Sequence, residues 1–131
     1  MIKANVVKDV LRMMNFDGIF WIVLASLQII LGIPLILFFG YGIPMIGCGI
    51  WNIYAATRTL RNVKVFRQHP SLIFPHWRDS INTILIMIGV NFFLGGFIGV
   101  LAGLYDLMVR SYVMKHEADL KEISLTERSG E

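Results

Sequence analysis

Two long stretches consist almost entirely of apolar residues, and they limit what this chain can fold into more than any other feature. Residues 18–39 run for 22 positions and residues 81–109 for 29 positions with few polar interruptions. Neither stretch follows the helical or strand period of a half-buried element, so both indicate contact with lipid rather than a water-soluble core. At about 1.5 Å of helix per residue, the first stretch spans the roughly 30 Å hydrocarbon core of a bilayer.

Charge and cysteine content support this interpretation. Only 16% of the residues are charged, whereas soluble domains average about 25%. Cys48 is the single cysteine and lies inside an apolar stretch. A disulfide framework or a cysteine-based metal site within one chain is therefore excluded.

The first stretch begins a helical hairpin, residues 18–57. Pro34 lies within its first helix, where it is expected to introduce a kink because proline lacks a backbone donor. Gly40–Tyr41–Gly42 is typical of a tight turn, and Pro44 suits the first turn of the following helix. A second apolar helix then completes the hairpin.

The hairpin recurs later in the chain. When the chain is shifted by 54 positions, residues 26–61 align with residues 80–115 without a gap, and seven of the 36 pairs are identical. Polar and aromatic pairs such as Asn52/Asp106 match in kind, which chance similarity of apolar residues does not explain. We infer an internal duplication. The identical pairs are Ser26/Ser80, Ile30/Ile84, Leu31/Leu85, Phe38/Phe92, Phe39/Phe93, Gly42/Gly96 and Gly49/Gly103.

Residues 81–109 allow two topologies: one strongly tilted helix, or two short helices that turn at Gly95–Gly96. The repeat places Gly95–Gly96 opposite Tyr41–Gly42, which favours the turn. With four crossings all twelve Lys and Arg residues fall on one side, whereas with three crossings four of them lie opposite the other eight. Lys and Arg beside membrane spans favour the cytoplasmic side.

The sequence therefore predicts an all-α integral membrane protein with four transmembrane helices arranged as two tandem repeated hairpins. We expect it in the plasma or inner cell membrane with both termini cytoplasmic, and a three-helix topology is the alternative. Three of the four spans cover only 14 to 16 residues, or about 21–24 Å of helix, which is short for a bilayer.

The segments that flank the hairpins carry the charges. Apolar residues at helical spacing in residues 1–17 predict an amphipathic helix on the membrane surface. After the first hairpin, four basic residues recur every third position, and each is expected to attract anionic lipid headgroups by about 1 kcal/mol. They are Arg58, Arg61, Lys64 and Arg67, and we expect Trp77 and Arg78 at headgroup level beside them.

These features divide the chain into five expected segments. The last is a polar tail in which Glu117 and Lys121 are spaced to form an ion pair. The segments are an interfacial segment 1–17, a transmembrane hairpin 18–57, a basic cytoplasmic arm and interfacial loop 58–77, a second transmembrane hairpin 78–113 and a cytoplasmic tail 114–131.

Asp106 is the only acidic residue well inside an apolar stretch. A carboxylate in a membrane helix suggests a proton relay, a cation site or a partner contact. Arg110 follows four residues later on the same helical face, so an ion pair near the inner interface is the simpler expectation. Asn52 holds the equivalent position in the first repeat, which favours a packing role for Asp106.

Four amide side chains and three glycines are the other candidate intramembrane contacts. The amides Gln28, Asn52, Asn82 and Asn91 are expected to form hydrogen bonds between helices, for about 0.5–2 kcal/mol each. A pore would require a more continuous polar stripe. Gly95, Gly99 and Gly103 share one helix face and allow close helix packing, either within the chain or between subunits.

No nucleotide-binding loop, nucleophile motif or metal-ligand spacing is present in the sequence. We therefore expect no enzymatic activity, cofactor, metal or nucleic-acid partner. The sequence favours a structural, docking or regulatory subunit that contacts anionic headgroups and assembles with itself or with a larger membrane protein. An oligomeric channel, pore or small proton-coupled transporter with Asp106 in its path is the alternative.

Overall fold

Helices account for all the regular structure that this computed structural model describes, in residues 2–38 and 40–130. The predicted all-α class is confirmed. Phe39 lies outside the described residues, so the expected repeat pair Phe39/Phe93 cannot be compared in the structure. The elements are α1 (Ile2–Leu37), α2 (Gly42–Gln68), the 3-10 turn η1 (Pro70–Leu72), α3 (Ile73–Arg78), α4 (Ile81–Leu94), α5 (Ile98–Lys115) and α6 (Glu117–Ser129).

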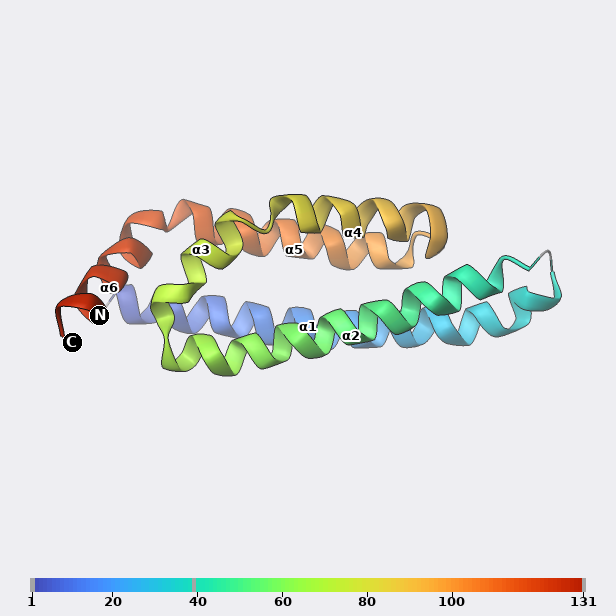
Figure 1. Ribbon diagram of the computed structural model, residues 1–131, viewed down its shortest axis with the longest axis horizontal. Coiled ribbons are helices and arrows are strands. Elements are labelled where there is room, and N and C mark those ends of the chain that lie inside the picture. The colour runs from blue at the N-terminus through green and yellow to red at the C-terminus, as the bar shows by residue number, and fades with distance from the viewer. Residues whose placement is uncertain (1, 39, 131) are drawn as a thin grey trace.

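Two antiparallel helix pairs form the molecule (Figure 1). The long pair consists of α1 and α2, which pack along most of their length, and the shorter pair consists of α4 and α5. Helix α5 packs on α1, whereas α4 makes few contacts with α2. Both termini lie at the end of the molecule that holds α3 and α6 (Figure 1).

Helix α1 is continuous through the expected boundary between residues 17 and 18. Its N-terminal apolar stripe, which includes Val6, Val10 and Met14, is buried against other helices of the chain. The stripe that the sequence suggested for a membrane surface thus packs against protein in this structure, within a helix that continues past residue 17. The absence of a side chain at Gly18 allows Leu60 of α2 to pack directly against the backbone at this junction.

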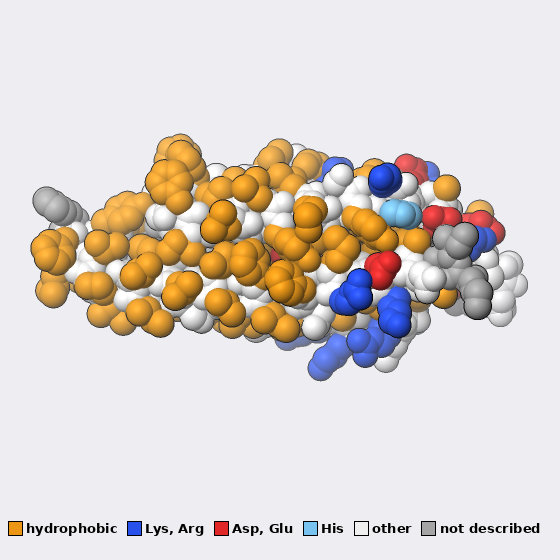
Figure 2. All heavy atoms as spheres, turned by 180° about the vertical axis from the view of Figure 1, so that it is seen from behind, with side chains coloured by type: hydrophobic (Ala, Val, Ile, Leu, Met, Phe, Trp, Pro, Cys, Tyr) orange, Lys and Arg blue, Asp and Glu red, His pale blue; other side chains and the backbone are white. Residues whose placement is uncertain are grey.

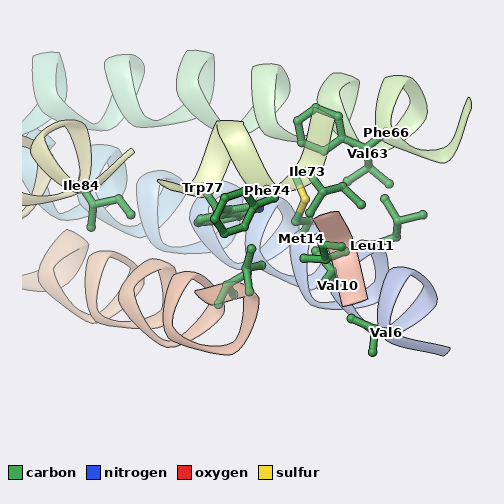
Figure 3. Packing of buried hydrophobic residues seen from close by; sticks show 13 residues of the cluster. Val6, Val10, Leu11, Met14, Val63, Phe66, Ile73, Phe74, Trp77 and Ile84 are labelled. Carbon is green, nitrogen blue, oxygen red and sulfur yellow. The ribbon is translucent and has the colours of Figure 1, made fainter. Parts of the chain in front are cut away.

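The end of the molecule that holds both termini has a core of buried apolar side chains, like that of a water-soluble protein (Figure 3). Trp77 belongs to this core and is only 4% exposed, so its expected place among lipid headgroups is not observed. The expected polar tail forms α6, which docks through buried Leu120 and contains the expected ion pair between Glu117 and Lys121. The core comprises Val6, Val10, Leu11, Met14, Val63, Phe66, Ile73, Phe74, Trp77, Ile84, Val109, Val113 and Leu120.

The other part of the molecule carries its large apolar side chains on the outside. Exposed aliphatic and aromatic residues cover α1 beyond Gly18, the first half of α2, and most of α4 and α5. Figure 2 shows this apolar surface extending over most of one face, with charged side chains gathered at one end. Among the described helices, only Lys3–Leu37 is both long and apolar enough to cross a membrane by length and composition, while Ile81–Leu94 is apolar but short.

The 29-residue apolar block is divided at Gly95–Phe97, where α4 ends and α5 begins. The backbone φ angles of 65° at Gly96 and 69° at Phe97 form the reversal. This turn stops well short of the α1–α2 turn (Figure 1). In the α1–α2 turn the glycine with positive φ is Gly40 rather than the repeat equivalent Gly42, so the two turns differ in register.

Candidate functional site

A fully hydrogen-bonded amide cluster joins three helices inside the apolar part of the molecule. Gln28 of α1, Asn52 of α2 and Asn91 of α4 are all completely buried. Asn52 Nδ2 donates to Gln28 Oε1 at 2.8 Å and to Asn91 Oδ1 at 2.7 Å. Gln28 Nε2 also donates to Asn91 Oδ1 at 2.9 Å, and the Cys48 thiol lies 3.3 Å from the same oxygen. These contacts match the expected role of the amides in holding helices together.

The α4–α5 turn is attached to this cluster through its backbone. The carbonyl of Gly95 accepts from Gln28 Nε2 at 3.0 Å, and the carbonyl of Phe93 accepts from the Tyr41 hydroxyl at 3.1 Å. Side chains of the first hairpin therefore satisfy carbonyls that the end of α4 leaves without helical partners.

The three glycines on one face of the second hairpin act within the chain. A Cβ at Gly95 or Gly99 would collide with Asn91, and a Cβ at Gly103 would collide with Ile88. This face therefore packs α5 closely against α4 and seats the Asn91 amide. A role in contacts between subunits is not needed to explain it.

A buried carboxyl group, Asp17, and a half-buried one, Asp106, belong to a second polar cluster. Asp17 of α1 is 1% exposed, and its side chain lines the same groove as that of Asp106 of α5. The indole N–H of Trp21 donates to both carboxyl oxygens of Asp106 at 3.2 Å each. Oδ1 of Asp17 has no hydrogen-bond partner among the described residues.

The expected ion pair between Asp106 and Arg110 is not formed. Arg110 instead donates to the backbone carbonyls of Trp77 at 3.0 Å and Arg78 at 3.2 Å. These carbonyls belong to the last turn of α3, where helical partners are lacking, so the guanidinium anchors α3 to α5. The spacing of Asp106 and Arg110 on one helix would allow an ion pair, but the guanidinium of Arg110 bonds to carbonyls of α3 instead.

An open groove leads to the acid pair between α2 on one side and α3 and α4 on the other. Its volume is about 690 Å³, and both Asp17 and Asp106 line it. Trp77 also lines the groove, and its indole N–H has no hydrogen-bond partner among the described residues. Arg58 and His76 lie in the same lining. Desolvation, and secondarily the charge of Arg58, lowers the pKa of the His76 imidazole, which favours the neutral ring.

No protein-family model, curated protein or solved structure matches this chain. The chemistry of the site is therefore inferred from its own geometry. The described residues contain no group of three or more His, Cys, Asp or Glu side chains arranged to hold a metal ion. The groove combines acidic, aromatic and hydrogen-bonding groups.

The structure brings together only some of the expected site residues. Gln28, Asn52 and Asn91 converge, whereas Asn82, the repeat equivalent of Gln28, is exposed. Asn52 and Asp106, which the expected repeat aligns, occupy different environments. Asp17 was missed because it immediately precedes the first apolar stretch, although an acid four residues before Trp21 on one helical face was a usable signal.

A basic ledge, defined as Arg58, Arg61, Lys64 and Arg67, projects from the C-terminal half of α2. All four residues are exposed, while Val63 and Phe66 between them are buried in the core. Within the described residues, none of the four forms an ion pair. The ledge is therefore a set of solvated cations on a rigidly packed helix.

Proposed function

We propose that this protein is a small multi-pass membrane protein that serves as a structural and docking subunit of a membrane complex. The continuous apolar exterior of α1, α2, α4 and α5 supports a bilayer environment, since soluble proteins rarely expose such large apolar surfaces. The fully satisfied amide cluster supports a rigid scaffold. The partner is a second copy of the chain or a larger membrane protein.

In this proposal α1 and α2 cross the bilayer completely, and both termini are cytoplasmic. The α4–α5 hairpin enters from the cytoplasmic side and turns within the hydrocarbon. Three observations support this placement. Helix α4 has 14 residues, or about 21 Å of helix. The turn that follows it bonds to Gln28 in the middle of the apolar part of α1, and Phe93 and Phe97 at this turn are exposed. Backbone turns at membrane depth require partners from the protein, which Gln28 and Tyr41 supply here.

The docking role is carried by the basic ledge. Four exposed cations held on a helix whose other face is buried present a fixed positive surface directly beside the apolar exterior. Such a surface attracts anionic headgroups by about 1 kcal/mol for each charge. We propose the anionic cytoplasmic leaflet as its first contact.

The test compares lipid selectivity of the reconstituted protein. Spin-labelled anionic and zwitterionic lipids report the preference of the wild type for anionic headgroups. The triple variant Arg61→Gln, Lys64→Gln and Arg67→Gln is expected to lower that preference at least fivefold, since three charges are lost. The matched control neutralises Lys115, Lys121 and Arg128 at the other end of the chain and should change it less than twofold. Equal effects of the two triple variants would refute docking through the ledge.

The acid pair favours a second candidate, movement of protons or cations. Two carboxyl groups that share a groove in a membrane helix bundle are typical of ion-handling sites. In liposomes, an Asp106→Asn variant that stays assembled but loses proton or cation flux would support transport. If the wild-type protein shows no proton or cation flux in liposomes, and Asp106→Asn does not change the oligomeric mass, the docking role remains as the function.

A further inference from the structure

The groove contains two buried polar atoms that lack partners among the described residues, and they have opposite hydrogen-bonding roles. Oδ1 of Asp17 is an acceptor, and Nε1 of Trp77 is a donor. Both residues line the groove and are almost completely buried. More than about nine in ten buried polar groups are hydrogen-bonded in native proteins. A ligand that carries both a donor and an acceptor would satisfy both atoms.

The charges of the groove define the sign of the ligand. Asp17 and Asp106 both line the groove, and among the described residues the hydrogen bonds to Asp106 come from the neutral indole of Trp21. A primary ammonium carries a positive charge and three donors, so it can satisfy Asp17 Oδ1 and still contact Asp106. The aromatic walls formed by Trp51 and Tyr54 also suit a cation.

The size and position of the groove define the rest of the ligand. A volume of about 690 Å³ lies within the range of about 300–1,000 Å³ for small-molecule sites and far exceeds the roughly 30 Å³ of one water. Ile84 and Met87 of α4 add apolar surface to the lining. An apolar chain can therefore leave the groove sideways between α2 and α4, which make few contacts with each other.

We propose that this groove binds an amine-bearing amphiphile, with its ammonium group at Asp17 and Asp106, a nearby oxygen accepting from Trp77, and its apolar chain directed into the bilayer. This inference rests on the membrane placement given under the proposed function. The ligand chemistry has two sources, an aminophospholipid headgroup or a free long-chain amine. Arg58 in the lining offers a partner for the phosphate of the former.

Tryptophan fluorescence provides a direct test, because the three tryptophans of the chain, Trp21, Trp51 and Trp77, all line the groove. The full chain is incorporated into phosphatidylcholine nanodiscs and titrated with dodecylammonium, dodecanol and dodecyl sulfate, which share one chain length. We expect a saturable change in emission with dodecylammonium at a concentration at least tenfold lower than with the other two. Equal responses to the three amphiphiles would overturn the proposal, and this comparison needs no variant.

Variants then locate the site. Asp17→Asn and Asp106→Asn are each expected to weaken dodecylammonium binding at least tenfold, whereas Asp119→Asn on α6 should change it less than twofold. Undiminished binding in both groove variants would refute the assignment. Replacing part of the phosphatidylcholine with phosphatidylethanolamine distinguishes the two sources. Weaker dodecylammonium binding would show that the lipid headgroup competes for the groove, whereas unchanged binding would identify a free amine as the ligand. Failure to enter nanodiscs would contradict the proposed function, whereas entry without selective binding would contradict only this inference.

Discussion

Asn91 links α4 to both helices of the first hairpin. Its oxygen accepts from Gln28, Asn52 and Cys48, and its amide nitrogen donates to the Met87 carbonyl at 2.9 Å. One residue of α4 thereby holds α1 and α2 in register. The side chain fits only because Gly99 leaves space for it.

Replacing Asn91 with leucine is expected to destabilise the fold. The substitution keeps the size of the side chain but leaves buried donors of Gln28 and Asn52 with fewer acceptors, which should cost about 1–2 kcal/mol. Unfolding in mixed detergent micelles containing sodium dodecyl sulfate, followed by circular dichroism, measures the change. Asn82→Leu is the matched control on the same helix, and because Asn82 is exposed we expect a change below about 0.5 kcal/mol. A comparable loss in both variants would contradict a specific role for Asn91.

Residue chemistry was easier to predict from the sequence than residue partners. An amide in an apolar helix must find a hydrogen bond, so the packing role of Gln28 and Asn52 followed from composition alone. Which way a helix is rotated depends on its neighbours, and this rotation buries Asn91 and exposes Asn82. For the same reason the location of Asp106 in the same groove as Asp17, 89 residues away in sequence, had no local signal.

At the scale of elements, the two hairpins are unequal. Helix α1 has 36 residues, whereas α4 has 14. The position of the second turn at Gly95 was predictable, since glycines are suited to a reversal and the repeat pointed to the same place. Its depth was not predictable, because it follows from the hydrogen bonds of Gln28 and Tyr41 to backbone carbonyls of the turn.

Cysteine accessibility tests whether the second turn lies inside the hydrocarbon. Phe38 and Phe97 stand at the two turns and are equally exposed on the protein, at 63% and 61%. In a Cys48→Ala background, Phe38→Cys should react with a membrane-impermeant maleimide added from outside, and Phe97→Cys should react at least tenfold more slowly. Both should react alike after solubilisation in denaturant. Equal labelling in intact membranes would favour four complete crossings instead.

At the scale of the whole molecule, two kinds of packing meet in one helix bundle. One end has apolar residues inside (Figure 3) and charged side chains on its surface (Figure 2), as in a water-soluble domain. The other part has an amide cluster inside and apolar residues outside. Helix α1 runs through both parts. The amphipathic pattern of its N-terminal stripe is the same whether its partner is lipid or protein, so the sequence alone does not distinguish a membrane-surface helix from one packed on the core.

This division predicts opposite tolerance to charge at two equally exposed positions. Ile30 in the apolar part of α1 is 61% exposed, and Leu125 on α6 is 64% exposed. An aspartate near the centre of a membrane span costs about 3 kcal/mol on insertion scales. Ile30→Asp should therefore reduce the membrane-inserted fraction severalfold or more, whereas Leu125→Asp should leave it unchanged.

The measurement is the fraction of protein that resists alkaline extraction from membranes, with total expression as the control. The two substitutions introduce the same group at nearly the same exposed fraction, so a difference between them reports only the surrounding solvent. If both variants inserted and folded like the wild type, Ile30 would face water or a polar partner, and the apolar exterior would be an interface with another protein. If only Ile30→Asp lowers the membrane-inserted fraction, lipid surrounds this part of the bundle. The docking role, the depth of the second turn and the lateral opening of the groove all depend on this condition.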